Sequence, residues 1–405
     1  MLFESQIRPE SVFATVVSLS LFLNVEFIRS RFLEDKKRQS FIFGISSLFT
    51  AVLLHCLRPA WGFGVVFASL PVLVSLFYGT EVVRRKCVLI GTSALLVLAF
   101  LIFPETYLAK GDSGSETFGA RVLFATHADM IRDQIAADLA TGSSTPYPTD
   151  WLASVQAALT NDIERTSAVA QKSLGFNSEY IMWEDSSYNK ITKDFGGDPH
   201  KIASFCWYYY KRVLLHQPWR MTKKIIRQLH YFYTIPCPVY QRREQEPIKI
   251  AKSYEAPMRV LSGYMTGVTP WVGVREYLAR CERNKTTNVS IPARAWVGVL
   301  HRFLGSSYLA CLSAAVAINA IILTLPRWRR QLGAFALFTL LVYSYNFGTC
   351  LTVAIAHIVE VRRYSHVQLG FTMLAQFLTF GLLLEFAALS GKEIICRVRA
   401  KAGRP

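Results

Sequence analysis

Long apolar stretches constrain this chain more than any other feature of its sequence. A helix needs roughly 20 apolar residues to cross the ~30 Å hydrocarbon core of a bilayer. Seven stretches approach that length: Ser11 to Ile28, Phe41 to Leu57, Ala60 to Gly79, Cys87 to Phe103, Gly305 to Leu325, Leu332 to Ala356 and Val367 to Leu389. A segment surrounded by lipid satisfies its backbone polar groups by forming a helix. We therefore predict an all-α, polytopic membrane protein of about seven transmembrane helices.

The composition agrees with lipid as part of the solvent. Of the 405 residues, 52% are hydrophobic and only 18% are charged, whereas a soluble domain is nearer a quarter charged. The net charge of +17 is concentrated in short clusters beside the apolar stretches. That placement is typical of the positive-inside rule rather than of nucleic-acid binding. We expect the lipid bilayer as a partner, and no nucleic acid.

The basic clusters also predict an orientation. Lysines and arginines follow the first, third, fifth and seventh apolar stretches, at residues 29–38, 84–86, 327–330 and 392–404. If these loops are cytoplasmic, the N-terminus lies outside and the C-terminus inside. Arg362 and Arg363 then lie on the outer side, against the rule. No eukaryotic sorting signal is evident, so we expect a bacterial inner membrane.

The segment between the fourth and fifth apolar stretches has no membrane-length apolar run. We predict three domains: transmembrane helices 1–4 in residues 1–104, an outer-face domain in 105–302, and transmembrane helices 5–7 with a basic tail in 303–405. Residues 105–200 carry 7 basic and 14 acidic side chains, and residues 201–294 carry 17 and 5. The outer-face domain shows little strand-like alternation, so we expect it to be mostly helical. One disulfide among Cys206, Cys237 and Cys281 is compatible with this placement, and no pair is selected.

A histidine and two aspartates lie close together early in the outer-face domain. In the amphipathic run from Thr126 to Leu139, Asp129 and Asp133 are four residues apart and share a helix face, with His127 nearby. Such a group can act as a catalytic base or bind a divalent cation. The alternative is a pair of acidic residues placed favourably near a helix N-terminus. No other pattern indicates a metal or a cofactor.

The second half of the outer-face domain contains a basic amphipathic helix. Pro218 ends the preceding helix and suits the first turn of this one. An apolar stripe is formed by Met221, Ile225, Leu229 and Phe232, and the opposing face carries Arg220, Lys223, Lys224 and Arg227 beside Trp219. A cationic face, an apolar face and flanking aromatic residues are typical of a helix in the membrane interface. The alternative is a core-packed helix with a solvated basic face.

Two segments resemble a known family. Arg212-Val-Leu-Leu-His-Gln-Pro-Trp-Arg with the basic helix after it, and His357-Ile-Val-Glu-Val-Arg-Arg-Tyr, are similar to elements of polytopic, C-type glycosyltransferases that use lipid-phosphate-linked sugars. Together they cover under a tenth of the chain. The resemblance implies that Arg362, Arg363 and Tyr364 face the donor phosphate. The family has its catalytic acid in the first outer loop, whereas the outer N-terminus of this chain offers only Glu4 and Glu10. Asp129 is then the first candidate for that acid.

The sequence leaves three functions open. One is a transferase that moves a sugar from a polyprenyl-phosphate-linked donor to an acceptor at the outer face, with arginines stabilising the leaving phosphate. The second is a non-enzymatic envelope protein whose outer domain binds lipid or a protein partner. The third is a transporter, which calls for polar or broken helices at the midplane. The apolar stretches and the lack of a repeat argue against the third.

Overall fold

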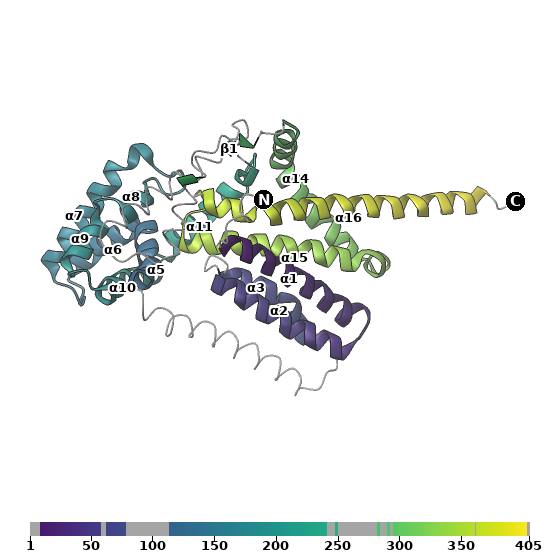
Figure 1. The fold of residues 1–405 in the computed structure, drawn as a ribbon, viewed down its shortest axis with the longest axis horizontal. Coiled ribbons are helices and arrows are strands. Elements are labelled where there is room, and N and C mark those ends of the chain that lie inside the picture. Colours follow the sequence, from purple (N-terminus) through teal and green to yellow (C-terminus); the bar gives the residue numbers. More distant parts are fainter. Residues whose placement is uncertain are drawn as a thin grey trace. The chain divides into compact units, whose positions relative to one another are not determined.

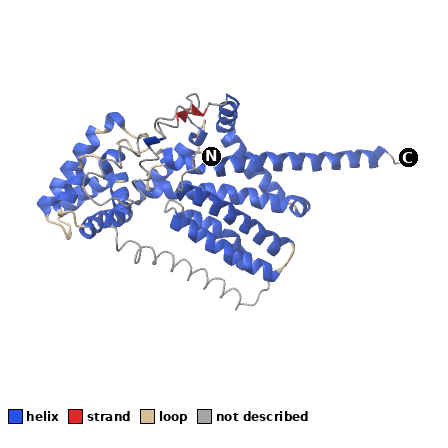
Figure 2. Cartoon of the chain, in the orientation of Figure 1, coloured by secondary structure: helices blue, strands red, loops and turns tan. Residues whose placement is uncertain are grey.

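The computed structural model describes residues 9–57, 62–77, 113–240, 248–249, 282–283, 290–291, 295–360 and 362–402. Helices make up almost all of this part of the chain (Figure 2). Its contacts divide the protein into two compact units. The first is Met1–Thr234 with Leu309–Pro405, and the second is Ile235–Tyr308. The domain boundaries expected from the sequence stay a prediction.

The first unit contains a group of apolar helices (Figure 1). They are α1 (Pro9–Ile28) with a short π-helical extension η1 (Arg29–Leu33), α2 (Lys37–Leu57), α3 (Gly62–Phe77), α15 (Pro326–Ala356) and α16 (Arg362–Ala402). Helix α1 packs on α2, α2 on α3, and both α3 and α16 pack on α15. A further long helix, α14 (Ala295–Thr324), begins in the second unit and ends in the first.

Among the residues that the structure describes, three helices are long and apolar enough to cross a membrane. They are α14, α15 and the part of α16 from Gln368 to Ile395. The helical class is therefore confirmed, and a membrane-embedded chain agrees with these three helices. Helices α1, α2 and α3 lie where the first three apolar stretches were predicted, and the fourth stretch, Cys87 to Phe103, lies outside the described residues. Seven spans stay a prediction.

The basic residues after the fifth stretch do not form a loop. Helix α15 begins at Pro326, so Arg327, Arg329 and Arg330 belong to its first turns, and only Leu325 separates α15 from α14. Proline suits the first position of a helix because its fixed φ is already helical and its missing N–H has no partner there. The connection between the fifth and sixth apolar stretches is therefore much shorter than the sequence predicts. Helix α16 likewise continues past Leu389 to Ala402.

Helices α3 and α15 approach each other closely. A Cβ atom added to Gly348 of α15 would lie 2.7 Å from the Phe67 ring and 3.0 Å from the Cα of Gly64. Neither distance is compatible with a side chain at position 348 unless a neighbour moves. The glycine therefore sets the spacing of the two helices.

Polar side chains join the apolar helices at several points. The Nδ2 atom of Asn24 donates to the Tyr345 hydroxyl at 2.8 Å, and Asn346 donates to the Thr372 hydroxyl at 2.7 Å. The buried face of α15 is thus more polar than its overall composition suggests. Between helices in lipid, such bonds fix which faces meet. Apolar length, from which this span was predicted, does not indicate such a polar face.

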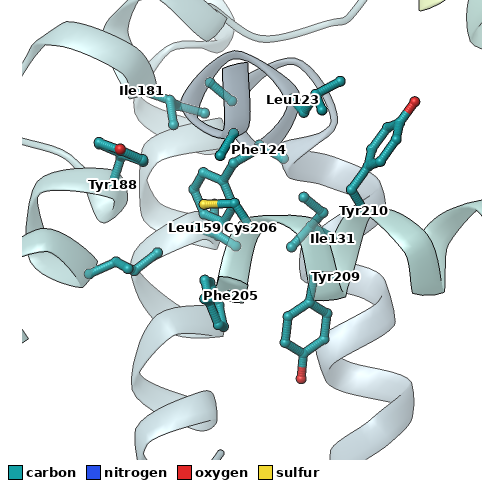
Figure 3. Close-up of a cluster of buried hydrophobic side chains, with 14 of the residues drawn as sticks. Leu123, Phe124, Ile131, Leu159, Ile181, Tyr188, Phe205, Cys206, Tyr209 and Tyr210 are labelled. Atoms are coloured by element: carbon teal, nitrogen blue, oxygen red, sulfur yellow. The ribbon is translucent and has the colours of Figure 1, made fainter. Parts of the chain in front are cut away.

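The described residues 113–232 form seven helices: α5 (Ser113–Thr126), α6 (Ala128–Thr141), α7 (Thr149–Arg165), α8 (Ser178–Trp183), α9 (Ser187–Asp194), α10 (Pro199–His216) and α11 (Pro218–Phe232), with the 3-10 turn η5 (Ser167–Val169). Their apolar faces enclose one core, part of which is shown in Figure 3. Phe124, Ile131, Leu159 and Phe205 are fully buried there. Ala356 at the end of α15 packs against the same core, so this end of α15 is in contact with the helical layer.

The second unit contains the short 3-10 turn η6 (Pro238–Tyr240) and two short antiparallel strands, β1 (Ile248–Lys249) and β2 (Ser290–Ile291). The amide of Cys237 donates to the carbonyl of Gly305 at 3.0 Å. Cys206 in the first unit and Cys237 in the second are both buried, free thiols. Cys281 lies outside the described residues.

Candidate functional site

The candidate site begins at the break between α5 and α6. Helix α5 ends at Thr126, and His127 has non-helical backbone angles before α6 starts at Ala128. The imidazole of His127 is fully buried. Its Nδ1 atom lies 2.8 Å from the carbonyl oxygen of Leu123, so Nδ1 carries the proton and Nε2 is left as an acceptor.

The partner of that acceptor is Lys224 of α11. The ammonium nitrogen Nζ of Lys224 lies 3.0 Å from Nε2 of His127, 3.3 Å from the carbonyl oxygen of Ile355 and 3.2 Å from that of His357. An ammonium has three hydrogens, and here each has an acceptor. Two of the acceptors are carbonyl groups at the C-terminal end of α15. A cation there satisfies groups that the helix leaves unpaired and lies at the negative end of its dipole.

Burial changes the protonation of both side chains. Lys224 is only 6% exposed, and burial lowers its pKa from 10.5 to about 7, with Asp129 acting in the opposite direction. Burial and the neighbouring Lys224 hold the pKa of His127 well below its usual range. His127 is therefore a neutral acceptor, and Lys224 exchanges its proton close to neutral pH.

An ionic network lies beside this pair. Arg220 of α11 donates from one nitrogen to Asp133 at 2.6 Å and from the other to Asp129 at 3.1 Å. Both carboxylates thus point the same way from α6, as their four-residue spacing predicts. Burial raises the pKa of Asp129, although Arg220 acts in the opposite direction. The network ties α6 to α11.

A second ion pair has no counterpart in the sequence analysis. The carboxylate of Asp138, 3% exposed, accepts from Arg212 of α10 at 2.5 Å and from Gln134 at 2.9 Å. Arg212 belongs to the first segment that resembles the transferase family. In this structure its guanidinium bonds a buried carboxylate of α6. Because Arg212 lies 74 residues from Asp138, the sequence around either residue does not indicate that they form an ion pair.

The link after α15 is also anchored, by hydrogen bonds to residues 172–173 and to helix α11. Glu360 accepts hydrogen bonds from the backbone amides of Lys172 at 3.0 Å and Ser173 at 2.6 Å. Gln228 of α11 donates to the Ser173 hydroxyl at 2.5 Å and accepts from the amide of Val359 at 2.7 Å. These bonds connect residues 172–173, α11 and the chain that leaves α15.

The structure separates the residues predicted for the basic face of α11. Trp219 is 73% exposed, and Lys223 and Arg227 are exposed as well. Lys224 was predicted on the same face, and that prediction is wrong. The buried side of α11 passes through Met221, Lys224, Gln228 and Phe232, so it is offset from the expected apolar stripe. Arg220 points to the two aspartates.

The three residues predicted to face a donor phosphate are not tested by the structure. Arg362, Arg363 and Tyr364 form the first turn of α16, and their side chains lie outside the described part. Their assignment to a donor phosphate stays a prediction. Within the described ranges, no group of three or more His, Cys, Asp or Glu residues could hold a metal ion.

An apolar and cationic surface covers the outward side of α11 and the end of α10. Trp219, Lys223, Ile226, Arg227 and His230 are spaced as one helix face, and all are exposed. Just before Pro218, Leu215 is 76% exposed and Leu214 is 41% exposed. We call these seven residues the α11 surface. Large apolar side chains beside unpaired cations are unusual on a surface that meets only water.

No family model, no curated protein and no solved structure matches the chain.

Proposed function

We propose that this protein is a non-enzymatic, membrane-embedded protein whose outer helical layer, residues 113–233, binds anionic lipid head groups through the α11 surface. One observation carries the proposal. Helix α11 packs against α15, and Lys224 bonds the carbonyl groups at one end of that helix. Because α15 is long and apolar enough to span a bilayer, its end lies near the head groups, and α11 lies at the same level.

The side chains of the α11 surface suit that position. Trp219 has an apolar ring with one polar N–H, which favours the boundary between hydrocarbon and water. Lys223 and Arg227 form no ion pair in the part of the chain that the structure describes. Each cation close to an anionic bilayer contributes about 1 kcal/mol of attraction. Ile226, 56% exposed, supplies apolar area between them.

The depth of a spin label at residue 226 tests the proposal. The full chain carrying Ile226→Cys is labelled with a nitroxide, after replacement of reactive native cysteines, and placed in bilayers with or without phosphatidylglycerol. We expect oxygen, which enters lipid, to increase the spin relaxation rate of the nitroxide. A water-soluble nickel reagent should have little effect on that rate. Val169→Cys is the matched control, because Val169 is an exposed apolar residue of the same helical layer. Equal nickel accessibility at both positions would overturn the proposal.

The cations are tested separately. Lys223→Gln with Arg227→Gln removes the two charges from the α11 surface and leaves the Lys224 cluster in place. We expect the dependence of the label's depth on phosphatidylglycerol to disappear. A dependence that stays unchanged would show that the charges have no part in lipid binding.

Sugar transfer from a polyprenyl-phosphate-linked donor is a second proposal. It is supported by Asp129, whose pKa burial raises, because a base with a raised pKa takes up a proton more readily. In that reaction the bond between sugar and phosphate breaks, a bond from the acceptor oxygen to the sugar forms, and Asp129 takes the acceptor proton. Arg220 already bonds Asp129, which favours the non-enzymatic proposal. If the wild-type chain transfers the sugar and Asp129→Asn abolishes that transfer, the enzymatic proposal is favoured instead.

A further inference from the structure

A cavity lies among the apolar helices, at the opposite end of α15 from Lys224. Its volume is about 740 Å³, within the ~300–1,000 Å³ of specific small-molecule sites. Phe67 and Leu70 of α3 and Leu337 and Leu341 of α15 contribute to an apolar wall. Leu70 is 37% exposed, so the wall reaches the surface of these helices.

Two arginines lie at one end of this cavity. Arg329 and Arg330 line it from the first turns of α15, and the lining extends along the same helix to Ser344. At 1.5 Å per residue, that stretch of α15 is about 22 Å long. It exceeds half of the ~30 Å hydrocarbon core. The cavity therefore has the length of one leaflet, with cations at one end only.

The cationic end lies at the level expected for head groups. Helix α15 has 31 residues, which makes it about 46 Å long, longer than the ~30 Å core. Its first turns therefore extend beyond the hydrocarbon. Helix α1 runs antiparallel to α15. Ser20 and Asn24 of α1 both bond Tyr345 of α15. Ile28 and Phe32, further along the chain, line the cavity beside residues of α15 that precede Tyr345.

Two of the charges at this end have no partner among the described residues. Arg327, two residues earlier, pairs with Glu393 of α16. Arg329 and Arg330 are exposed, and neither forms an ion pair with any residue that the structure describes. A guanidinium group binds a phosphate through a planar fork of donors. An apolar channel of leaflet length that ends in two such groups matches one chemistry, a phosphate with an acyl tail.

We infer that this cavity, which we call the α3–α15 groove, binds one anionic phospholipid, with its phosphate on Arg329 and Arg330 and one acyl chain along Phe67, Leu70 and Leu337. Basic sites between transmembrane helices bind lipid head groups in this manner. The groove is separate from the α11 surface, and its occupant is a specific molecule rather than the bilayer face.

The first experiment compares two lipids with the same tails. The full chain is purified in detergent, stripped of lipid and titrated with dioleoyl phosphatidylglycerol or with dioleoyl phosphatidylcholine. Binding is counted by native mass spectrometry. We expect saturable binding of phosphatidylglycerol that Arg329→Gln with Arg330→Gln weakens about 10- to 30-fold, as removal of two charge contacts predicts. Lys392→Gln, an exposed cation of α16 outside the groove, is the matched control and should bind as the wild type does.

The second experiment locates the tail and does not depend on the arginine variants folding. Ala334 lines the groove, and Ala334→Cys is treated with a maleimide, with labelling at that residue measured by peptide mapping. We expect labelling in the lipid-stripped protein and protection by phosphatidylglycerol, but none by inorganic phosphate or phosphatidylcholine. If the cysteine is blocked in the stripped protein, another part of the chain fills the groove and the inference fails. It also fails if both lipids protect equally.

The two lipid proposals are distinguishable. Lys223→Gln with Arg227→Gln should leave protection of Ala334→Cys unchanged, since neither residue lines the groove. Loss of protection in that variant would mean that binding at the α11 surface accounts for both signals, and would overturn a separate site.

Discussion

The ammonium nitrogen of Lys224 lies 3.0 Å from Nε2 of His127, and both side chains are buried. The remaining two hydrogens of Lys224 bond carbonyl oxygens of Ile355 and His357. One lysine therefore joins the α5–α6 break, helix α11 and the end of α15. A buried cation whose direct acceptors are all neutral makes this junction sensitive to pH.

The Lys224 junction predicts a pH-dependent stability. The folded pKa is about 7 and the unfolded value is 10.5. Between those values the unfolded chain binds more protons at this residue, so the site's contribution to stability rises as the pH rises from about 7 to 10.5. Below about pH 7 both states are protonated and that contribution stays constant at its lowest value. We expect the melting temperature in detergent to rise between pH 7 and pH 9, and Lys224→Met to flatten that rise.

Lys223→Met is the matched control for this prediction. Lys223 is the preceding residue on α11 and is exposed, so its removal should leave the slope intact. The pKa of His127 is held well below its usual range by burial and by Lys224, so the imidazole stays neutral across this pH range. An unchanged slope in Lys224→Met would mean that the ammonium is not buried.

The Arg220 network should contribute modestly to stability. Its three side chains are roughly a third exposed, and exposed pairs are typically worth up to about 1 kcal/mol. We expect a double-mutant cycle of Arg220→Ala and Asp133→Ala to give a coupling energy of about 1 kcal/mol, measured by chemical unfolding. High salt should reduce it. A coupling near zero would leave the network without a stabilising role.

The pair of Arg212 and Asp138 should contribute far more, because the carboxylate is buried. Removal of one partner leaves a charge without compensation, which costs about 3–5 kcal/mol. We expect Arg212→Met to lower stability by that amount, and addition of Asp138→Leu to restore most of it. Lys211→Met, at the exposed preceding residue of α10, should change stability little. If the double variant is no more stable than Arg212→Met, the carboxylate is not the source of the loss.

Glu360 should protect two particular amides from exchange. Its carboxylate accepts from the backbone N–H groups of Lys172 and Ser173. We expect Glu360→Ala to raise hydrogen exchange at these two amides about tenfold or more, which corresponds to ~1.4 kcal/mol of local opening. The amide of Glu184, which follows α8 and bonds the carbonyl of Tyr180, should exchange as before. A uniform increase across residues 113–233 would instead indicate a global loss of stability.

Gly348→Ala tests the contact between α3 and α15. The added carbon would overlap the Phe67 ring and the backbone of Gly64, and overpacking typically costs about 1–3 kcal/mol. We expect a lower melting temperature in detergent. Gly370→Ala in α16 is the control, since nothing lies within 4 Å of its added carbon and helical alanine is favoured over glycine by about 1 kcal/mol. A stabilising Gly348→Ala would refute the close approach.

Local patterns in the sequence predicted the helical class and several details of the site. Pro218 marks the start of α11 as expected, because the ring removes an N–H that the first turn does not need. Asp129 and Asp133 share a face because four residues complete about one helical turn. These inferences need only residues close together in the chain.

Long-range partners could not be predicted in the same way. Lys224 was assigned to a cationic face because it lies among Arg220, Lys223 and Arg227 in a basic amphipathic helix, whereas its partner His127 lies 97 residues earlier. Nothing near Lys224 in the sequence indicates that acceptor. The polar face of α15 was missed for a similar reason, since Asn346 and Thr372 become a pair only when α15 and α16 pack.

The close approach at Gly348 also has an evolutionary consequence. Positions 64 and 348 lie 284 residues apart, yet the backbone of Gly64 occupies the space that a side chain at 348 would need. Related sequences should therefore substitute the two positions in concert, and a larger residue at either should coincide with a smaller one in place of Phe67. Such covariation, rather than overall identity, is the signature by which distant relatives of this chain would be found.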